Sequence, residues 1–85
     1  MNDSLYRGPV KRSIAIAGHP TSISLEPAFW EALAAAAAAR GLPLNALVAR
    51  IDVERIAAAA PPNLASAIRL WLFHHGGDAQ KPQSG

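Results

Sequence analysis

Apolar and polar residues alternate with a period of two in two short segments near the start of the chain. In residues 11–17 two isoleucines alternate with small residues, and in residues 21–25 Ile23 and Leu25 alternate with two serines. This alternation predicts two short β-strands, each with an apolar and a polar face. A Gly-His-Pro run at 18–20 predicts a break between them. The pattern leaves two arrangements open: a hairpin within one chain, or an arm strand followed by a strand that pairs with a second copy.

After the second strand the apolar spacing changes to steps of three and four residues, which predicts helices. The predicted helices cover residues 27–40, 43–60 and 64–75. Gly41 and the apolar Leu42 after it are typical of a Schellman ending for the first helix, and Asn63 suits the N-cap of the third. The third helix is apolar over most of its surface, because Leu70 and Phe73 add a second apolar side. We therefore expect it to be buried, in a subunit interface.

These elements predict one small domain, mostly α with a short β-ribbon, over residues 11–75. We expect residues 1–10 to form a flexible arm and residues 76–85 a disordered polar tail. A chain of 85 residues buries only about 60% of its unfolded surface, and it has no cysteine for disulfides, so we expect self-association to stabilise it. The expected core residues are Ile14, Ile16, Ile23, Leu25, Phe29, Trp30, Leu33, Leu44, Leu47, Val48, Ile51, Leu64, Ile68, Trp71 and Leu72.

The charge pattern is mildly basic and does not identify a partner by itself. The formal net charge is +2 with a sequence pI near 9.7, and Arg7, Lys11 and Arg12 cluster near the N-terminus. The first residues lack the apolar core of a signal peptide, and no segment reaches the roughly 20 apolar residues that span a bilayer. We therefore expect a cytoplasmic protein without a membrane partner.

The sequence lacks the spacings that indicate catalysis or metal binding. It contains no nucleophile-elbow, phosphate-loop or metalloprotease motif. The adjacent His74 and His75 are unsuited to a shared metal ion, because neighbouring positions on a helix do not face one site. We expect no catalytic residue, no metal ligand and no cofactor, and hence not an enzyme.

The chain also carries a series of short motifs along its predicted elements. They are KRS at 11–13, GH at 18–19, TS at 21–22, SLE at 24–26, FW at 29–30, ID at 51–52, ER at 54–55, NL at 63–64, SA at 66–67 and R at 69. Together they resemble a bacterial subfamily of ribbon-helix-helix (Arc/MetJ-type) proteins predicted to bind DNA. The resemblance implies an intertwined homodimer whose paired strands form an antiparallel ribbon in the DNA major groove. The third helix is an addition to the minimal two-helix fold.

The resemblance also implies a set of DNA contacts. Strand residues that face away from the helices contact base edges, which here means Ser22 and Ser24, with His19 or Pro20 at the start of the strand. A serine hydroxyl can donate or accept a hydrogen bond but discriminates bases poorly, so we expect modest readout. The expected phosphate contacts are Lys11 and Arg12 before the ribbon strand, and Leu44 and Asn45 at the start of the second helix.

The function that this resemblance implies is sequence-specific transcriptional regulation by a homodimer bound to double-stranded DNA. Whether dimers pair into tetramers stays open. The alternative is a dimeric protein-interaction module, adaptor or antitoxin-like, whose apolar third helix binds a protein partner. The small net charge and the serine-only ribbon favour that alternative.

Overall fold

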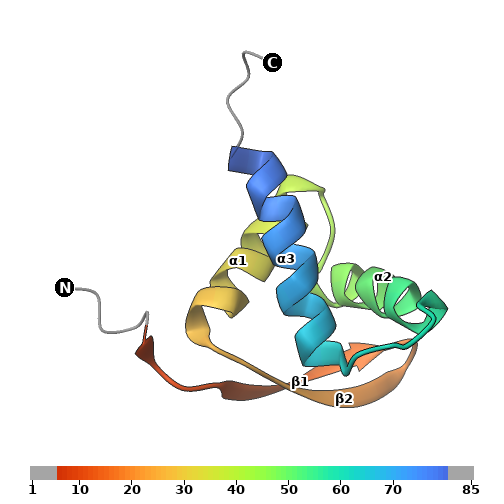
Figure 1. Ribbon diagram of the computed structural model, residues 1–85. Helices are drawn as coiled ribbons and strands as arrows, with labels where there is room; N and C mark the ends of the chain where they lie inside the picture. Colours follow the sequence, from red (N-terminus) through yellow and green to blue (C-terminus); the bar gives the residue numbers. More distant parts are fainter. Residues whose placement is uncertain (1–5, 81–85) are drawn as a thin grey trace.

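The computed structural model describes residues 6–80, and the side chains of residues 6–76. The elements in chain order are β1 (Val10–Ile16), β2 (His19–Leu25), α1 (Pro27–Ala39), α2 (Leu44–Ala57) and α3 (Leu64–Gln80). The two strands form a sheet along one side of the molecule, and the helices all lie over one face of it (Figure 1). The predicted fold class, mostly α with a short β-ribbon and a third helix, is confirmed.

β1 and β2 pair with each other inside one chain, as an antiparallel hairpin. Ile16 lies opposite His19, so the loop between the strands is Ala17-Gly18. Both loop residues have positive φ, 52° at Ala17 and 83° at Gly18, as in a type I′ turn, whose twist matches that of the flanking strands. Of the two arrangements that the sequence left open, the structure shows pairing within the chain for residues 11–17.

β2 continues through the proline at position 20. The residues that flank a two-residue loop form a hydrogen-bonded pair, and non-hydrogen-bonded pairs then alternate with hydrogen-bonded ones. Pro20 lies opposite Ala15 in the second pair, so its missing N–H faces the free edge of β2 and costs no bond to β1. The predicted break at residues 18–20 is therefore wrong for His19 and Pro20, which belong to β2.

α1 begins and ends as the sequence predicts. Pro27 is its first residue, where the missing N–H is no loss. At the other end Gly41 has a φ of 66°. The Gly41 N–H donates to the Ala38 carbonyl at 3.0 Å, and the Leu42 N–H donates to the Ala37 carbonyl at 2.9 Å. This pair of bonds confirms the Schellman ending.

α2 is shorter than predicted, and α3 is longer. The Asn63 side-chain oxygen accepts a hydrogen bond of 2.8 Å from the Ser66 N–H, which confirms the N-cap of α3. Residues 76–80, which we expected to begin the tail, continue the helix, because a glycine costs a helix only about 1 kcal/mol and does not by itself end it. Of the predicted arm, Val10 belongs to β1. Residues 1–5 of the arm and 81–85 of the tail lie outside the described residues.

The strands and helices of the chain bury a common hydrophobic core. Every expected core residue is buried or partly buried, and Ala37 and Ala67 join them. α2 packs on β1 and α3 packs on β2, while α1 contacts both other helices. The largest fully buried side chains are Leu25, Leu33, Leu47, Val48, Ile51 and Ile68. These side chains form a core between the hairpin and the three helices.

α3 buries only one side of its surface. Ile68 and Leu72 face the core, but Leu70 is 62% exposed and Phe73 is 84% exposed. Within one chain α1 and α2 cover α3 from one direction only, and the burial of its other side in a subunit interface stays a prediction. Among the described helices none is long and apolar enough to cross a membrane alone; α1 and α2 reach that level only as a pair bent by 98°.

Candidate nucleic-acid interface

The hairpin has two faces, and only one packs against the helices. Successive side chains of a strand point to opposite sides, so the pairing register assigns every residue to a face. Ile14, Ile23 and Leu25 are buried beneath the helices, on what we call the inner face. The outer face points away from the helices and consists of Lys11, Ser13, Ala15, Pro20, Ser22 and Ser24.

The outer face brings the predicted base-reading serines together with a lysine and a further serine. Lys11 lies opposite Ser24, and Ser13 lies opposite Ser22. Lys11, Ser13 and Ser22 are exposed and Ser24 is partly exposed. Ser13 was not among the predicted contacts. Its alternation with the isoleucines of the first strand would have identified it, had pairing within the chain been known.

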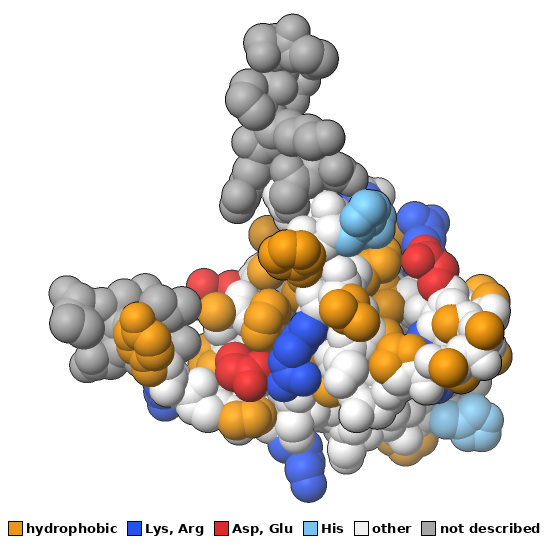
Figure 2. Space-filling model, viewed as in Figure 1, with side chains coloured by type: hydrophobic (Ala, Val, Ile, Leu, Met, Phe, Trp, Pro, Cys, Tyr) orange, Lys and Arg blue, Asp and Glu red, His pale blue; other side chains and the backbone are white. Residues whose placement is uncertain are grey.

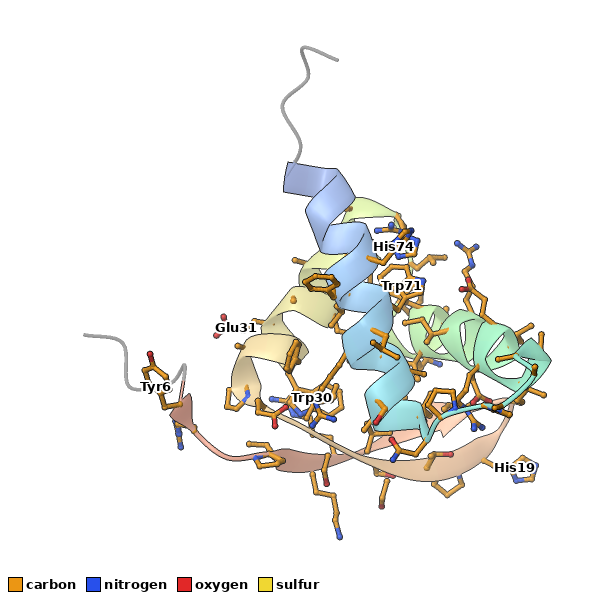
Figure 3. The ribbon with its side chains drawn as sticks, viewed as in Figure 1. Tyr6, His19, Trp30, Glu31, Trp71 and His74 are labelled. Atoms are coloured by element: carbon orange, nitrogen blue, oxygen red, sulfur yellow. The ribbon has the colours of Figure 1, made fainter. Side chains whose placement is uncertain are left out.

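His19 does not share the outer face. It lies opposite Ile16 beside the turn, one position from Pro20, so alternation directs it to the other side of the sheet from the two β2 serines. Figure 3 shows His19 at the tip of the hairpin, directed sideways beyond the end of the sheet. The structure therefore does not bring His19 together with Ser22 and Ser24, and Pro20 occupies the outer-face position at the start of β2.

Lys11 and Arg12 are separated by the same alternation. Arg12 lies on the helix side, where its guanidinium carbon is 5.0 Å from the centre of the Trp30 ring, a cation–π contact. The Trp30 Nε1 donates a hydrogen bond of 2.9 Å to the Val10 carbonyl, which fixes the start of β1 against α1. Arg7 and Arg12 both line a cleft beside this indole. Of the two predicted arm contacts, only Lys11 faces outward with the serines.

The start of α2 contains the two backbone N–H groups that we expect to contact phosphate. The Pro43 carbonyl accepts from the Ala46 and Leu47 N–H groups, at 3.1 and 3.2 Å. The N–H groups of Leu44 and Asn45 precede the first intrahelical bond, so by position they lack a helical acceptor and carry the positive end of the helix dipole. α2 packs against β1, which puts these donors in the helical layer and not on the outer face.

The sequence matches a family profile over the hairpin, α1, α2 and most of α3. The ribbon-helix-helix domain profile covers residues 9–75. The chain belongs to the ribbon-helix-helix domain family. Members of this family are generally DNA-binding transcriptional regulators, which confirms the resemblance at the level of the family. Searches of curated proteins and of solved structures found no match.

In this ribbon-helix-helix domain, an ion pair ties the third helix to the end of the ribbon. Arg69 of α3 donates to one carboxylate oxygen of Glu26, which directly follows β2. The pKa of Glu26 lies below its usual value, first because the backbone N–H of Glu26 donates to its carboxylate and second because Arg69 does. The pair is partly exposed to solvent, so it positions α3 over β2 and contributes little to stability.

The outer face of this ribbon-helix-helix domain is a polar surface. Among the side chains of residues 6–76, no group of three or more His, Cys, Asp or Glu could hold a metal ion. The outer face offers serine hydroxyls, one ammonium group and the backbone of a strand edge. Such groups make hydrogen bonds and phosphate contacts, which is the chemistry of groove recognition.

Proposed function

We propose that this protein is a bacterial transcriptional regulator that binds double-stranded DNA as a homodimer and reads the major groove with the outer face of its hairpin. The observation that carries the proposal is the composition of that face. Three serines and Lys11 point away from the core, on a sheet that the helices hold rigid from behind. A regulator of this kind acts on the chromosome, in the bacterial cytoplasm.

The free edge of β2 supports pairing with a second copy. Because Thr21, Ile23 and Leu25 occupy the hydrogen-bonded positions toward β1, the backbone groups of Ser22 and Ser24 point to the free edge. Two such edges can pair antiparallel, which gives a four-stranded sheet in which the two β2 strands are central.

The two central strands of such a sheet suit the width of the groove. The major groove is about 12 Å wide and admits a two-stranded ribbon, and strands lie about 4.8 Å apart, so the two β2 strands fit inside it while the two β1 strands, about 14 Å apart, flank it. The central serines, Ser22 and Ser24, then face base edges, while Lys11 of each β1 meets the phosphates along the groove walls. Leu44 and Asn45 offer further phosphate contacts through their N–H groups, and Arg12 a weaker one. His19 is left out, because it lies off the outer face.

The proposal is tested by fluorescence anisotropy of a randomised duplex pool at several salt concentrations. Binding is expected to weaken steeply with salt, because neutralised phosphates release counterions. The double substitution Ser22→Glu and Ser24→Glu should abolish binding and leave the circular dichroism spectrum unchanged. An absence of binding by the unmodified protein at low salt, or full binding by the double variant, would overturn the assignment.

A second candidate function is a protein-interaction module of adaptor or antitoxin type. The exposed Leu70 and Phe73 on α3 favour it, together with a net charge of only +2. The two functions differ in their response to charge reversal of Lys11 and Arg12. A regulator loses DNA affinity and salt dependence in that variant, whereas a protein-interaction module keeps its partner and shows no salt-dependent DNA binding before or after the change.

A further inference from the structure

The outward side of α3 carries the most exposed large apolar side chain among the described residues. Phe73 is 84% exposed, and Leu70, one turn earlier on the same side, is 62% exposed. Phe73 also follows Arg69 by four residues, so it lies directly above the Glu26–Arg69 ion pair on the helix surface. Figure 2 views this side of the molecule, where hydrophobic side chains lie exposed beside charged ones over α3. We refer to Leu70 and Phe73 as the α3 face.

The α3 face lies on the same side of the molecule as the free edge of β2. The sheet has two strands, and α3 packs on β2 whereas α2 packs on β1. The Glu26–Arg69 pair joins α3 to the end of β2 directly. A second copy that pairs with the edge of β2 therefore brings its own α3 beside this one, on the same face of the extended sheet.

Pairing of the strand edges alone buries less apolar area than a stable dimer interface needs. Ile23 and Leu25, the apolar residues of β2, are already buried in their own chain, so the strand edge contributes mainly backbone hydrogen bonds. Stable interfaces bury about 1,200–2,000 Å², and a short isolated strand pair is marginal in water. A phenylalanine buries roughly 150–250 Å², so two copies of Phe73 and Leu70 supply apolar area that the ribbon lacks.

We propose that the α3 face is a second contact between two copies of this chain, formed by Leu70 and Phe73 against the same residues of the partner. The two-fold axis that relates the β2 strands then also relates the α3 helices, and the interface is self-complementary. This inference builds on the proposed homodimer and goes beyond the ribbon, since the additional helix acquires a role of its own. The hydrophobic effect, and not hydrogen bonding, drives this part of the association.

The other exposed apolar pair provides a matched control. Val53 is 67% exposed and Ile56 is 61% exposed, both on α2. α2 packs on β1, at least one strand spacing of about 4.8 Å farther from the edge that pairs. Val53 points away from its helix as Phe73 does, but it does not face the partner in this arrangement.

The chain has no cysteine, so single-cysteine variants test the contact directly. Phe73→Cys and Val53→Cys are each treated with a short bismaleimide cross-linker and separated on a denaturing gel. The expected result is a covalent dimer with Phe73→Cys and a monomer with Val53→Cys. Cross-linking at position 53 alone, equal cross-linking at both positions, or none at either position would overturn the proposal.

Sedimentation equilibrium supplies the second measurement. Phe73→Glu should raise the dissociation constant of the dimer at least tenfold, and Val53→Glu should leave it unchanged. At a protein concentration below that of dimerisation, both variants should melt like the unmodified protein. An unchanged constant for Phe73→Glu would overturn the α3 contact. Salt-dependent DNA binding is measured separately. A DNA-binding dimer whose dissociation constant is the same in Phe73→Glu contradicts only this inference, whereas a Phe73-dependent dimer that does not bind DNA contradicts only the proposed regulator.

Discussion

Arg69 donates two hydrogen bonds, of 2.9 and 3.0 Å, to one carboxylate oxygen of Glu26, across 43 positions of the sequence. Glu26 lies between the ribbon and α1, and Arg69 lies near the middle of α3. The pair therefore sets the position of α3 over the ribbon. The guanidinium of Arg69 also lies 5.7 Å from the centre of the Phe29 ring, which holds it from a second side.

Protonation of Glu26, whose carboxylate accepts from its own backbone N–H and from Arg69, should lower the stability of the protein slightly at acid pH. The pKa of Glu26 is lower in the folded protein than its usual value of 4.5, so its contribution is present above about pH 4.5 and is lost as the pH falls through the folded-state pKa. Urea midpoints measured at neutral and acid pH should fall less in Glu26→Gln than in the unmodified protein. Glu31→Gln, at an exposed position on α1, is the control and should keep the full pH dependence.

The loss of stability on truncating Leu47 or Phe73 to alanine should depend on how deeply each side chain is buried. Leu47 has no exposed surface, so Leu47→Ala should lower the free energy of unfolding by about 2–5 kcal/mol. Phe73 is exposed, so Phe73→Ala should change the stability of the monomer by no more than about 0.5 kcal/mol. Urea denaturation at a protein concentration below that of dimerisation measures both. A Leu47→Ala protein with an unchanged midpoint would contradict the observed core.

A side chain at position 18 should strain the turn of the hairpin. Gly18 has a φ of 83°, where an L-residue is disfavoured by roughly 1–2 kcal/mol. Gly18→Ala should lower the free energy of unfolding by about that amount and increase amide exchange in β1. Gly8→Ala is the control, because Gly8 has open space around it and no positive φ. Equal melting temperatures for the two variants would show that the type I′ turn is not required.

The salt dependence of DNA binding should separate two neighbouring basic residues. Lys11 lies on the outer face and Arg12 lies against Trp30. Each lost phosphate contact lowers the slope of log affinity against log salt by about 1, so Lys11→Ala should lower it by about 2 in a dimer and Arg12→Ala by less. Anisotropy titrations at several salt concentrations measure the slopes. The reverse order would show that the inner side of the hairpin contacts the backbone.

The sequence by itself predicted which helices and strands form and which residues are buried. The Schellman ending at Gly41, the N-cap at Asn63 and the apolar spacing of each helix depend on local geometry, which neighbouring residues determine. The buried positions followed from the same spacing, because a helix or strand can bury only one stripe of side chains. The faces of Ser22 and Ser24 were correct for this reason as well.

The pairing register of the two strands and the exposure of one side of α3 could be determined only from the tertiary structure. Alternation in residues 11–17 is the same whether the strand pairs with its own chain or with another, so only the observed pairing separated Lys11 from Arg12 and turned His19 away from the serines. The Glu26–Arg69 contact likewise joins residues that no local pattern relates. Leu70 and Phe73 are as apolar as their buried neighbours, and their exposure depends on which side α1 and α2 cover. Local preference thus determined what each segment becomes, and long-range packing decided which of its faces meets solvent.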